Sequence, residues 1–134
     1  MFNDFAPTTQ MLGRWQPWHA GHTELFKRAL AETGQVHIMV RTVPQKEDAS
    51  GGRTMVQDDN PFQAMDVIEN IKKELAKEGY EYADKYIITR VPNIVDISYG
   101  RGVGYTFTEH DLGEDIHNIS ATKIRAEMRA KGEL

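Results

Sequence analysis

The turn from Gly13 to His22 constrains the fold of this chain more than any other stretch, because the residue pattern changes across it. A short apolar run ends just before the turn. After it, four apolar residues recur at the spacing of one helix face; they are Leu25, Phe26, Ala29 and Leu30. Gly34 is well placed to cap that helix, and residues 35–41 then form a short apolar run typical of a buried strand. A strand, a helix and a strand in this order predict a right-handed βαβ unit.

Length and composition narrow the class of protein. With 134 residues the chain has the size of one domain, 1–134, which could also be cut from a longer protein. Its formal net charge of −4 argues against a nucleic-acid partner, because nucleic-acid-binding domains usually carry a basic patch. No apolar run reaches the roughly 18 residues of a membrane-spanning helix, and residues 1–5 lack the basic start of a signal peptide. We therefore expect a cytoplasmic protein with no membrane partner.

The same turn is a candidate anion site. The first N–H groups of a helix lack intrahelical partners, and the helix dipole adds positive charge there. Gly13 and Gly21 have no Cβ, which lets a ligand approach the main chain closely. His19 and His22, three residues apart, would lie together over the helix start near Arg14. These groups suit a polyphosphate, although a histidine pair at this position could also serve only as a helix cap.

A zinc site is a weaker alternative for the two histidines. Such a pair needs a third ligand, and the chain has no cysteine.

The middle of the chain supplies the remaining elements of the expected sheet. Residues 42–59 lack apolar periodicity, and within them Lys46 and Arg53 could fold over a bound triphosphate or simply belong to a solvated loop. Asn60 is placed as the N-cap of a second helix that ends at Gly79. The apolar face of this helix is expected to consist of Met65, Ile68, Ile71 and Leu75. Residues 85–91 predict a third strand, so we expect an α/β fold: a Rossmann-like parallel sheet with helices on both faces.

Two further stretches carry groups that could bind anions. Tyr99, Arg101 and Tyr105 lie among three glycines, where a flexible backbone presents a guanidinium fork and aromatic faces, although a simple hairpin is the default. Near the C-terminus, Ser120 is placed as the N-cap of a last helix, with Thr122 in its first turn. This helix start could face an anion, or it could be an ordinary capped helix.

The two ends of the chain resemble one known family. Residues 13–22 match the signature G-R-[FW]-Q-P-[FW]-H-x-G-H of the HxGH nucleotidylyltransferases without a gap, and residues 119–125 resemble its second signature, I-S-x-T-x-[IL]-R. The segments 60–62, 91–94 and 99–105 are similar to N-P-F, V-P-N-I and Y-G-R-x-V-G-Y of one subgroup. That subgroup contains phage cytidylyltransferases and the cytidylyltransferase domain of the two-part fosfomycin-pathway enzyme.

The resemblance implies a fold, a reaction and a set of site residues. It implies the HxGH nucleotidylyltransferase fold and transfer of a nucleotidyl group from a nucleoside triphosphate, with Mg²⁺ on the phosphates and release of pyrophosphate. The catalytic residues it implies are His19, His22 and Arg125. The nucleotide-binding residues are Gly13, Arg14, Trp15, Gly21, Ser120, Ala121 and Thr122. The expected acceptor-binding residues are Tyr99, Arg101 and Tyr105, and no protein metal ligand is expected.

The nucleotide and the acceptor follow from the subgroup. The Y-G-R-x-V-G-Y segment favours CTP and a small phosphonate or phosphate acceptor such as 2-hydroxyethylphosphonate. The alternatives are an ATP-using adenylyltransferase of the nicotinamide-mononucleotide type, whose members share the first signature, and a non-catalytic nucleotide-binding module. A homo-oligomer or a fusion to a second enzyme domain would be compatible with any of these.

Overall fold

The computed structural model describes residues 1–43, 46–47, 53–54, 61–101, 104–113 and 121–133. Its core is the predicted βαβ unit, extended by one more helix and strand. In chain order these elements are β1 (Thr9–Gly13), α1 (Ala20–Thr33), β2 (Val36–Arg41), α2 (Ala64–Lys77) and β5 (Tyr86–Val91). Gly34 caps α1 in the left-handed conformation (φ 92°), as its position after the helix predicted.

The three long strands form one parallel sheet in the order β1-β2-β5. β2 lies in the centre, with Val36 opposite Thr9 of β1 and Tyr86 of β5. The predicted parallel α/β sheet is therefore confirmed. All three strands end on the same side of the molecule, at Gly13, Arg41 and Val91.

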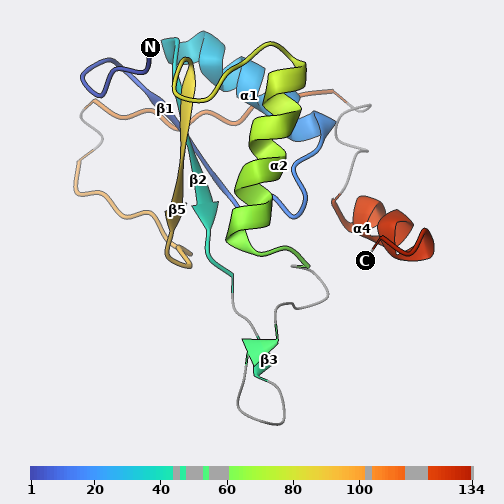
Figure 1. Ribbon diagram of the computed structural model, residues 1–134. Helices are drawn as coiled ribbons and strands as arrows, with labels where there is room; N and C mark the ends of the chain where they lie inside the picture. The colour runs from blue at the N-terminus through green and yellow to red at the C-terminus, as the bar shows by residue number, and fades with distance from the viewer. Residues whose placement is uncertain (44–45, 48–52, 55–60, 102–103, 114–120, 134) are drawn as a thin grey trace.

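Alternate residues of β2 point into the core. Val36, Ile38 and Val40 are buried, whereas the residues between them are half-buried. Phe26 of α1 packs edge-on against Tyr86 of β5, so α1 lies on the core face of the sheet. The buried residues of α2, which are Val67, Ile71 and Leu75, belong to the same apolar cluster. Both helices thus lie on one side of the sheet (Figure 1), whereas the prediction had helices on both faces. Two successive right-handed crossovers in the strand order β1-β2-β5 place α1 and α2 on the same face. Residues 94–97 approach the other side of the sheet beside Leu12.

The start of α2 differs from the prediction. The helix begins at Ala64 after Gln63, which makes no side-chain capping bond, while Asn60 lies outside the described residues. The reason is a long-range contact: the side-chain amide of Gln16 occupies both the N–H and the carbonyl of Phe62. Because both main-chain groups of Phe62 are paired with a side chain, the helix starts beyond them. Met65 is 67% exposed instead of belonging to the apolar face, whose buried residues are Val67, Ile71 and Leu75.

Two regions lie away from this core. Two short strands, β3 (Lys46–Glu47) and β4 (Arg53–Thr54), pair antiparallel within the stretch expected to be irregular. A ladder of main-chain hydrogen bonds needs no apolar periodicity, which is why the pattern did not reveal it. Towards the C-terminus, α4 (Ala121–Ala130) confirms the last predicted helix.

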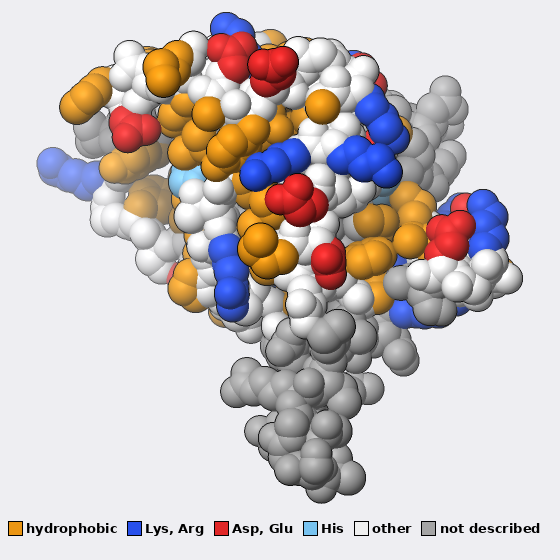
Figure 2. Space-filling model, viewed as in Figure 1, with side chains coloured by type: hydrophobic (Ala, Val, Ile, Leu, Met, Phe, Trp, Pro, Cys, Tyr) orange, Lys and Arg blue, Asp and Glu red, His pale blue; other side chains and the backbone are white. Residues whose placement is uncertain are grey.

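The surface around α2 carries both signs of charge. Figure 2 shows blue and red side chains interspersed on this face, and Lys72–Glu69 and Lys77–Glu74 are ion pairs along α2. Such exposed pairs stabilise a helix only slightly. None of the helices within the described ranges has the length and apolar character needed to cross a membrane.

Candidate functional site

The turn between β1 and α1 is held by its two tryptophans. Trp15 takes a left-handed backbone conformation (φ 55°), which is uncommon for a bulky residue. Its buried indole Nε1 donates to the carbonyl of Met39 on β2 at 3.0 Å. Trp15 thus fixes the turn against the sheet, and its predicted contact with a nucleotide stays a prediction.

Gly13 has a packing reason to be glycine. A Cβ at this position would lie 2.8 Å from two ring atoms of Trp15. The sequence suggested that Gly13 leaves space for a ligand, whereas the space beside it is filled by the indole. The close approach predicted at this position is therefore an approach of Trp15 to the main chain.

The two histidines form a reciprocal cap at the start of α1. The N–H of Gly21 donates to Nδ1 of His19 at 3.0 Å, and the N–H of His19 donates to Nδ1 of His22 at 3.1 Å. The rings stack with centroids 3.7 Å apart. The geometry is that of a capping box in which histidines replace the usual hydroxyl and carboxyl groups. The alternative that the histidines cap the helix is thus correct for their Nδ1 atoms. It assigns no role to their Nε2 atoms.

The cap assigns the tautomer of both rings. A nitrogen that accepts an N–H bond carries no proton, so each neutral imidazole is protonated at Nε2. Burial lowers the pKa of His22 to about 3, with a further contribution from His19, and burial also lowers the pKa of His19. Neither Nε2 makes a hydrogen bond to the described residues. The turn therefore presents two neutral Nε2–H donors at neutral pH.

The two imidazole rings act as hydrogen-bond donors on behalf of the backbone N–H groups at the helix start. Each backbone N–H at the positive end of α1 polarises an imidazole through Nδ1, which strengthens the Nε2–H of that ring as a donor. The N–H of Gly21, which the sequence suggested would meet a ligand directly, is already used in this way. An anion at this site would thus meet imidazole N–H groups in place of that main-chain N–H.

Aromatic contacts bury His22 and explain its pKa. The imidazole lies 4.8 Å from the ring of Trp15 and 5.5 Å from that of Trp18. Trp18 is itself buried, and its Nε1 donates to the hydroxyl of Thr23 at 2.8 Å. Charging His22 among these rings would lose hydration without a counter-charge, so burial holds the imidazole neutral.

Arg125 joins the two sequence signatures. It is the buried residue of α4, only 3% exposed, and its Nη1 donates to the main-chain carbonyl of Gln16 at 2.7 Å. Its Nη2 donates to the hydroxyl of Thr122 at 3.3 Å. Arg125, which the resemblance assigned to one site with His19 and His22, thus contacts the turn that carries these histidines. At least two of its donors are spent on the protein, so Arg125 positions α4 whether or not it also contacts phosphate.

Gln16 is the residue at this site that the sequence reasoning missed. Its side chain holds Phe62 at the entry of α2, while its carbonyl holds Arg125 of α4. The only signal in the sequence was its place inside the first signature.

The other predicted nucleotide-binding residues are placed as follows. Arg14 is half-buried just after β1, Gly21 is buried in the first turn of α1, and Ala121 opens α4. Ser120 lies outside the described residues. Lys46 and Arg53 belong to the short strands β3 and β4, and the structure describes only their backbone.

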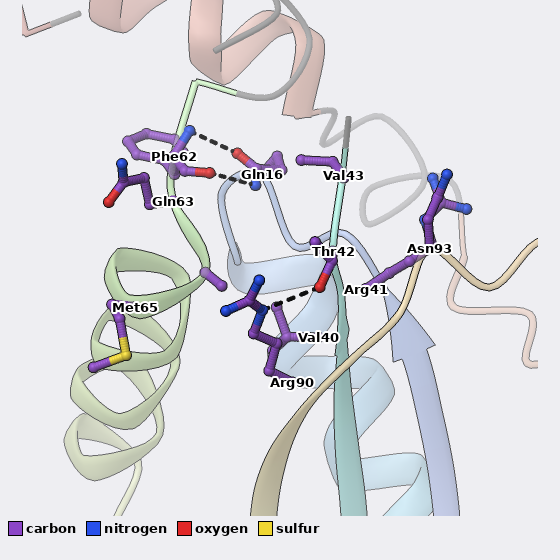
Figure 3. A pocket seen from close by; sticks show the side chains of 11 residues that line it. Gln16, Val40, Arg41, Thr42, Val43, Phe62, Gln63, Met65, Arg90 and Asn93 are labelled. Atoms are coloured by element: carbon purple, nitrogen blue, oxygen red, sulfur yellow. Dashed lines mark hydrogen bonds between the residues drawn. The ribbon is translucent and has the colours of Figure 1, made fainter. Parts of the chain in front are cut away.

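A pocket of about 450 Å³ opens where β2 and β5 end and α2 begins (Figure 3). This is the edge of a parallel sheet at which ligands bind. The described residues that line it are Gln16, Val40, Arg41, Thr42, Val43, Phe62, Gln63, Ala64, Met65, Arg90 and Asn93. Its size is within the range of small-molecule sites. Gln16 belongs both to this pocket and to the turn that carries the histidines, so the two features adjoin.

The residues expected to bind the acceptor lie elsewhere. Tyr99 and Tyr105 are 59% and 69% exposed, Arg101 is exposed, and Tyr99 stacks on Phe107. None of these residues is among those described as lining the pocket.

The described part of the chain holds no protein metal cage. No group of three or more His, Asp or Glu side chains is arranged there to hold a metal ion.

The chain is similar to a curated protein in sequence and to several solved structures in fold. The chain is 31% identical over 72 residues to nicotinamide-nucleotide adenylyltransferase of Methanococcus aeolicus; the match covers 54% of this chain and 37% of the relative. A bifunctional NMN adenylyltransferase/ADP ribose pyrophosphatase from Francisella tularensis matches with TM-score 0.52 and 22% identity. The structure of the bifunctional protein from that organism with AMP and a Mn ion matches with TM-score 0.50 and 20% identity. No family model matches the chain.

These matches show the fold and leave the activity to inference. Each structural match covers 66% of this chain and 23% of the other. The matched part thus has the α/β fold of these nucleotidyltransferase structures. The chain spans well under half the length of these proteins.

Proposed function

We propose that this chain carries the active site of a nucleotidylyltransferase. The observation that supports this most is the reciprocal histidine cap, which leaves two neutral Nε2–H donors over the start of α1. A structural cap needs only the Nδ1 atoms. Two outward donors beyond the end of a parallel strand suit the phosphates of a nucleotide.

The proposed reaction is an in-line displacement at the α-phosphorus. An oxygen of the acceptor phosphate or phosphonate forms a bond to the α-phosphorus, the bond from that phosphorus to the bridging β-phosphate oxygen breaks, and pyrophosphate leaves with the electron pair. The attacking oxygen is already anionic near neutral pH, so no general base is needed. Catalysis then consists of aligning the two anions and stabilising the developing charge.

His19 and His22 would supply part of that stabilisation. Each Nε2–H can donate to a phosphate oxygen, and the fixed rings need no reorganisation as charge moves onto the leaving group. Burial lowers the pKa of both imidazoles, that of His22 to about 3, which favours their neutral, donating form at neutral pH. Arg125 keeps α4 against the turn and could add positive charge to the triphosphate.

A divalent cation would belong to the substrate side of this site. Because the described residues offer no cage of three protein ligands, Mg²⁺ would be held chiefly by phosphate oxygens, whose charge it neutralises. The neighbouring structure that contains AMP also contains a Mn ion, which is compatible with a cation bound with nucleotide.

For the donor nucleotide we favour ATP, with a mononucleotide as acceptor. The similarity to a nicotinamide-nucleotide adenylyltransferase supports this alternative better than the cytidylyl reading. The pocket of about 450 Å³ is also larger than a two-carbon phosphonate requires. Use of CTP and 2-hydroxyethylphosphonate stays a second candidate, favoured by the segment that resembles Y-G-R-x-V-G-Y.

A pyrophosphate-release assay tests the proposal. ATP and CTP should each be combined with nicotinamide mononucleotide and with 2-hydroxyethylphosphonate in the presence of Mg²⁺, and one pair should give stoichiometric pyrophosphate and conjugate. Absence of product from all combinations, with nucleotide binding retained, would favour the non-catalytic module.

Two variants of His22 separate catalysis from capping. His22→Ala should lower kcat by roughly 100-fold, because it removes a donor to the transition state. His22→Gln keeps an acceptor for the N–H of His19, since glutamine is a natural third residue of a capping box. It should restore stability without restoring turnover to the wild-type rate. Near-normal turnover of the alanine variant would contradict the catalytic role.

A further inference from the structure

We propose that Arg90 binds the anionic group of the acceptor, a phosphate monoester or a phosphonate, inside the pocket between β2, β5 and α2. This inference rests on the proposed function, whose residues lie at the adjoining turn. It assigns the acceptor to a different place from the exposed segment 99–105.

Arg90 is held in position through its Nε. That atom donates to the hydroxyl oxygen of Thr42 at 3.1 Å, and the same hydroxyl donates to the carbonyl of Val91 at 2.7 Å. Because the hydroxyl hydrogen is committed to Val91, its oxygen is oriented as an acceptor for Arg90. Figure 3 shows the side chain extending from β5 into the space between β2 and α2.

The outer donors of Arg90 face this pocket without protein partners. Among the described residues, Nη1 and Nη2 of Arg90 make no hydrogen bond or ion pair. A guanidinium with a tethered Nε and two outward Nη atoms is a preformed fork for two oxygens of a tetrahedral anion. The tether also lowers the conformational entropy lost when such an anion binds.

Positive charge predominates among the described residues of the pocket. Its described lining contains two arginines, Arg41 and Arg90, and no aspartate or glutamate. Nε of Arg41 is buried without a hydrogen-bond partner in the described part of the chain, and its Nη1 makes only a long contact of 3.5 Å with the carbonyl of Ile94. Guanidinium groups gathered without a carboxylate would be stabilised by an anionic ligand.

The rest of the lining suits the remainder of a small polar molecule. Phe62 and Val40 offer apolar surface, while the polar groups at the rim include Gln16, whose turn bears the histidines. An acceptor held by Arg90 would thus lie in a cavity that adjoins the proposed nucleotide site. With separate subsites, the acceptor and the nucleoside triphosphate could be bound at the same time without competing for the same positively charged side chain.

Binding of a simple anion tests the assignment without turnover. Methyl phosphate and methylphosphonate should be titrated into ¹⁵N-labelled protein while the arginine Nε–H signals are followed by NMR. The Arg90 signal should shift and saturate, and the shift should persist with saturating ATP and Mg²⁺. An Arg90 signal that does not move, or a shift abolished by ATP, would overturn the proposal.

Steady-state kinetics provide the second test. Arg90→Lys keeps the charge but loses the fork, so it should raise the acceptor KM about 10-fold or more and leave the nucleotide KM within twofold. Arg28→Lys on α1, which makes the same exchange at an exposed position outside the pocket, is the control and should change neither KM. Arg101→Lys tests the rival segment in the same assay.

The outcomes separate this inference from the proposed function. A raised acceptor KM in Arg101→Lys with normal kinetics in Arg90→Lys would overturn the Arg90 assignment while the transferase stands. Anion binding at Arg90 in a protein that forms no product would support the pocket and contradict the proposed reaction. Nicotinamide mononucleotide and 2-hydroxyethylphosphonate, used as separate acceptors, distinguish a phosphate ester from a phosphonate.

Discussion

Because the side chain of Gly13 is a single hydrogen atom, the ring of Trp15 can lie against the main chain there. Gly13→Ala places a Cβ 2.8 Å from that ring, so the indole or the strand must move. We expect a loss of about 1–3 kcal/mol in the free energy of unfolding, the usual cost of overpacking. Urea denaturation measures this loss.

Gly100→Ala is the matched control for this substitution. Nothing lies within 4 Å of a Cβ at Gly100, so stability should change by less than about 1 kcal/mol. Equal effects of the two substitutions would mean that the indole does not restrict residue 13.

The neutral state of His22 predicts a dependence of stability on pH. Its pKa is 6.5 when unfolded and about 3 in the folded chain, so the unfolded state binds the proton first as pH falls. The stability due to this difference is complete above pH 6.5 and is lost progressively between pH 6.5 and about 3. Between pH 7.5 and 5, wild-type protein should lose about 2 kcal/mol more than His22→Gln. Urea titrations at the two pH values measure this; parallel losses would contradict a buried neutral imidazole.

Among the elements, α4 is joined to the turn between β1 and α1 through Arg125. Arg125 is the buried residue of this helix and reaches the carbonyl of Gln16, 109 residues away in sequence. Arg125→Met keeps much of the side-chain volume but removes the bond. Amide hydrogens of α4 should then exchange at least 10-fold faster, while those of α1 keep their protection, because α1 packs through Phe26 independently.

Hydrogen exchange followed by mass spectrometry resolves the two helices. Glu127→Met, at an exposed position of the same helix, is the control. If α4 exchanges equally in Arg125→Met and in wild type, the helix is held by other contacts.

For the whole molecule, ligand binding should reveal the preferred nucleotide through thermal stability. A ligand that binds only the folded state raises stability by about 2.7 kcal/mol at 100 times its Kd. With Mg²⁺ present, ATP should raise Tm more than CTP at the same concentration. A larger shift with CTP would favour the cytidylyl candidate, and His22→Ala should weaken the shift from either nucleotide if the histidines contact phosphate.

Sequence by itself determined the features that depend on near neighbours. The βαβ order, the end of α1 at Gly34 and the closeness of His19 to His22 all follow from residues a few positions apart. Periodicity and capping chemistry are local properties, so they can be read along the chain. The two signatures also placed Arg125 in one site with His19 and His22. Their resemblance to a family carries spatial information that the spacing of residues along the chain lacks.

Only the tertiary structure decided which distant groups meet. Gln16 pairs with Phe62, 46 residues away, and this contact moved the start of α2 beyond the predicted Asn60. Arg90 acquires its place because β2 and β5 end side by side, which brings Thr42 to its Nε. The sequence around one residue of such a pair does not indicate the other, because these bonds arise from strand order and not from the periodicity of residues along one element. Strand order decides which residues surround the pocket, and residue patterns within each element do not record it.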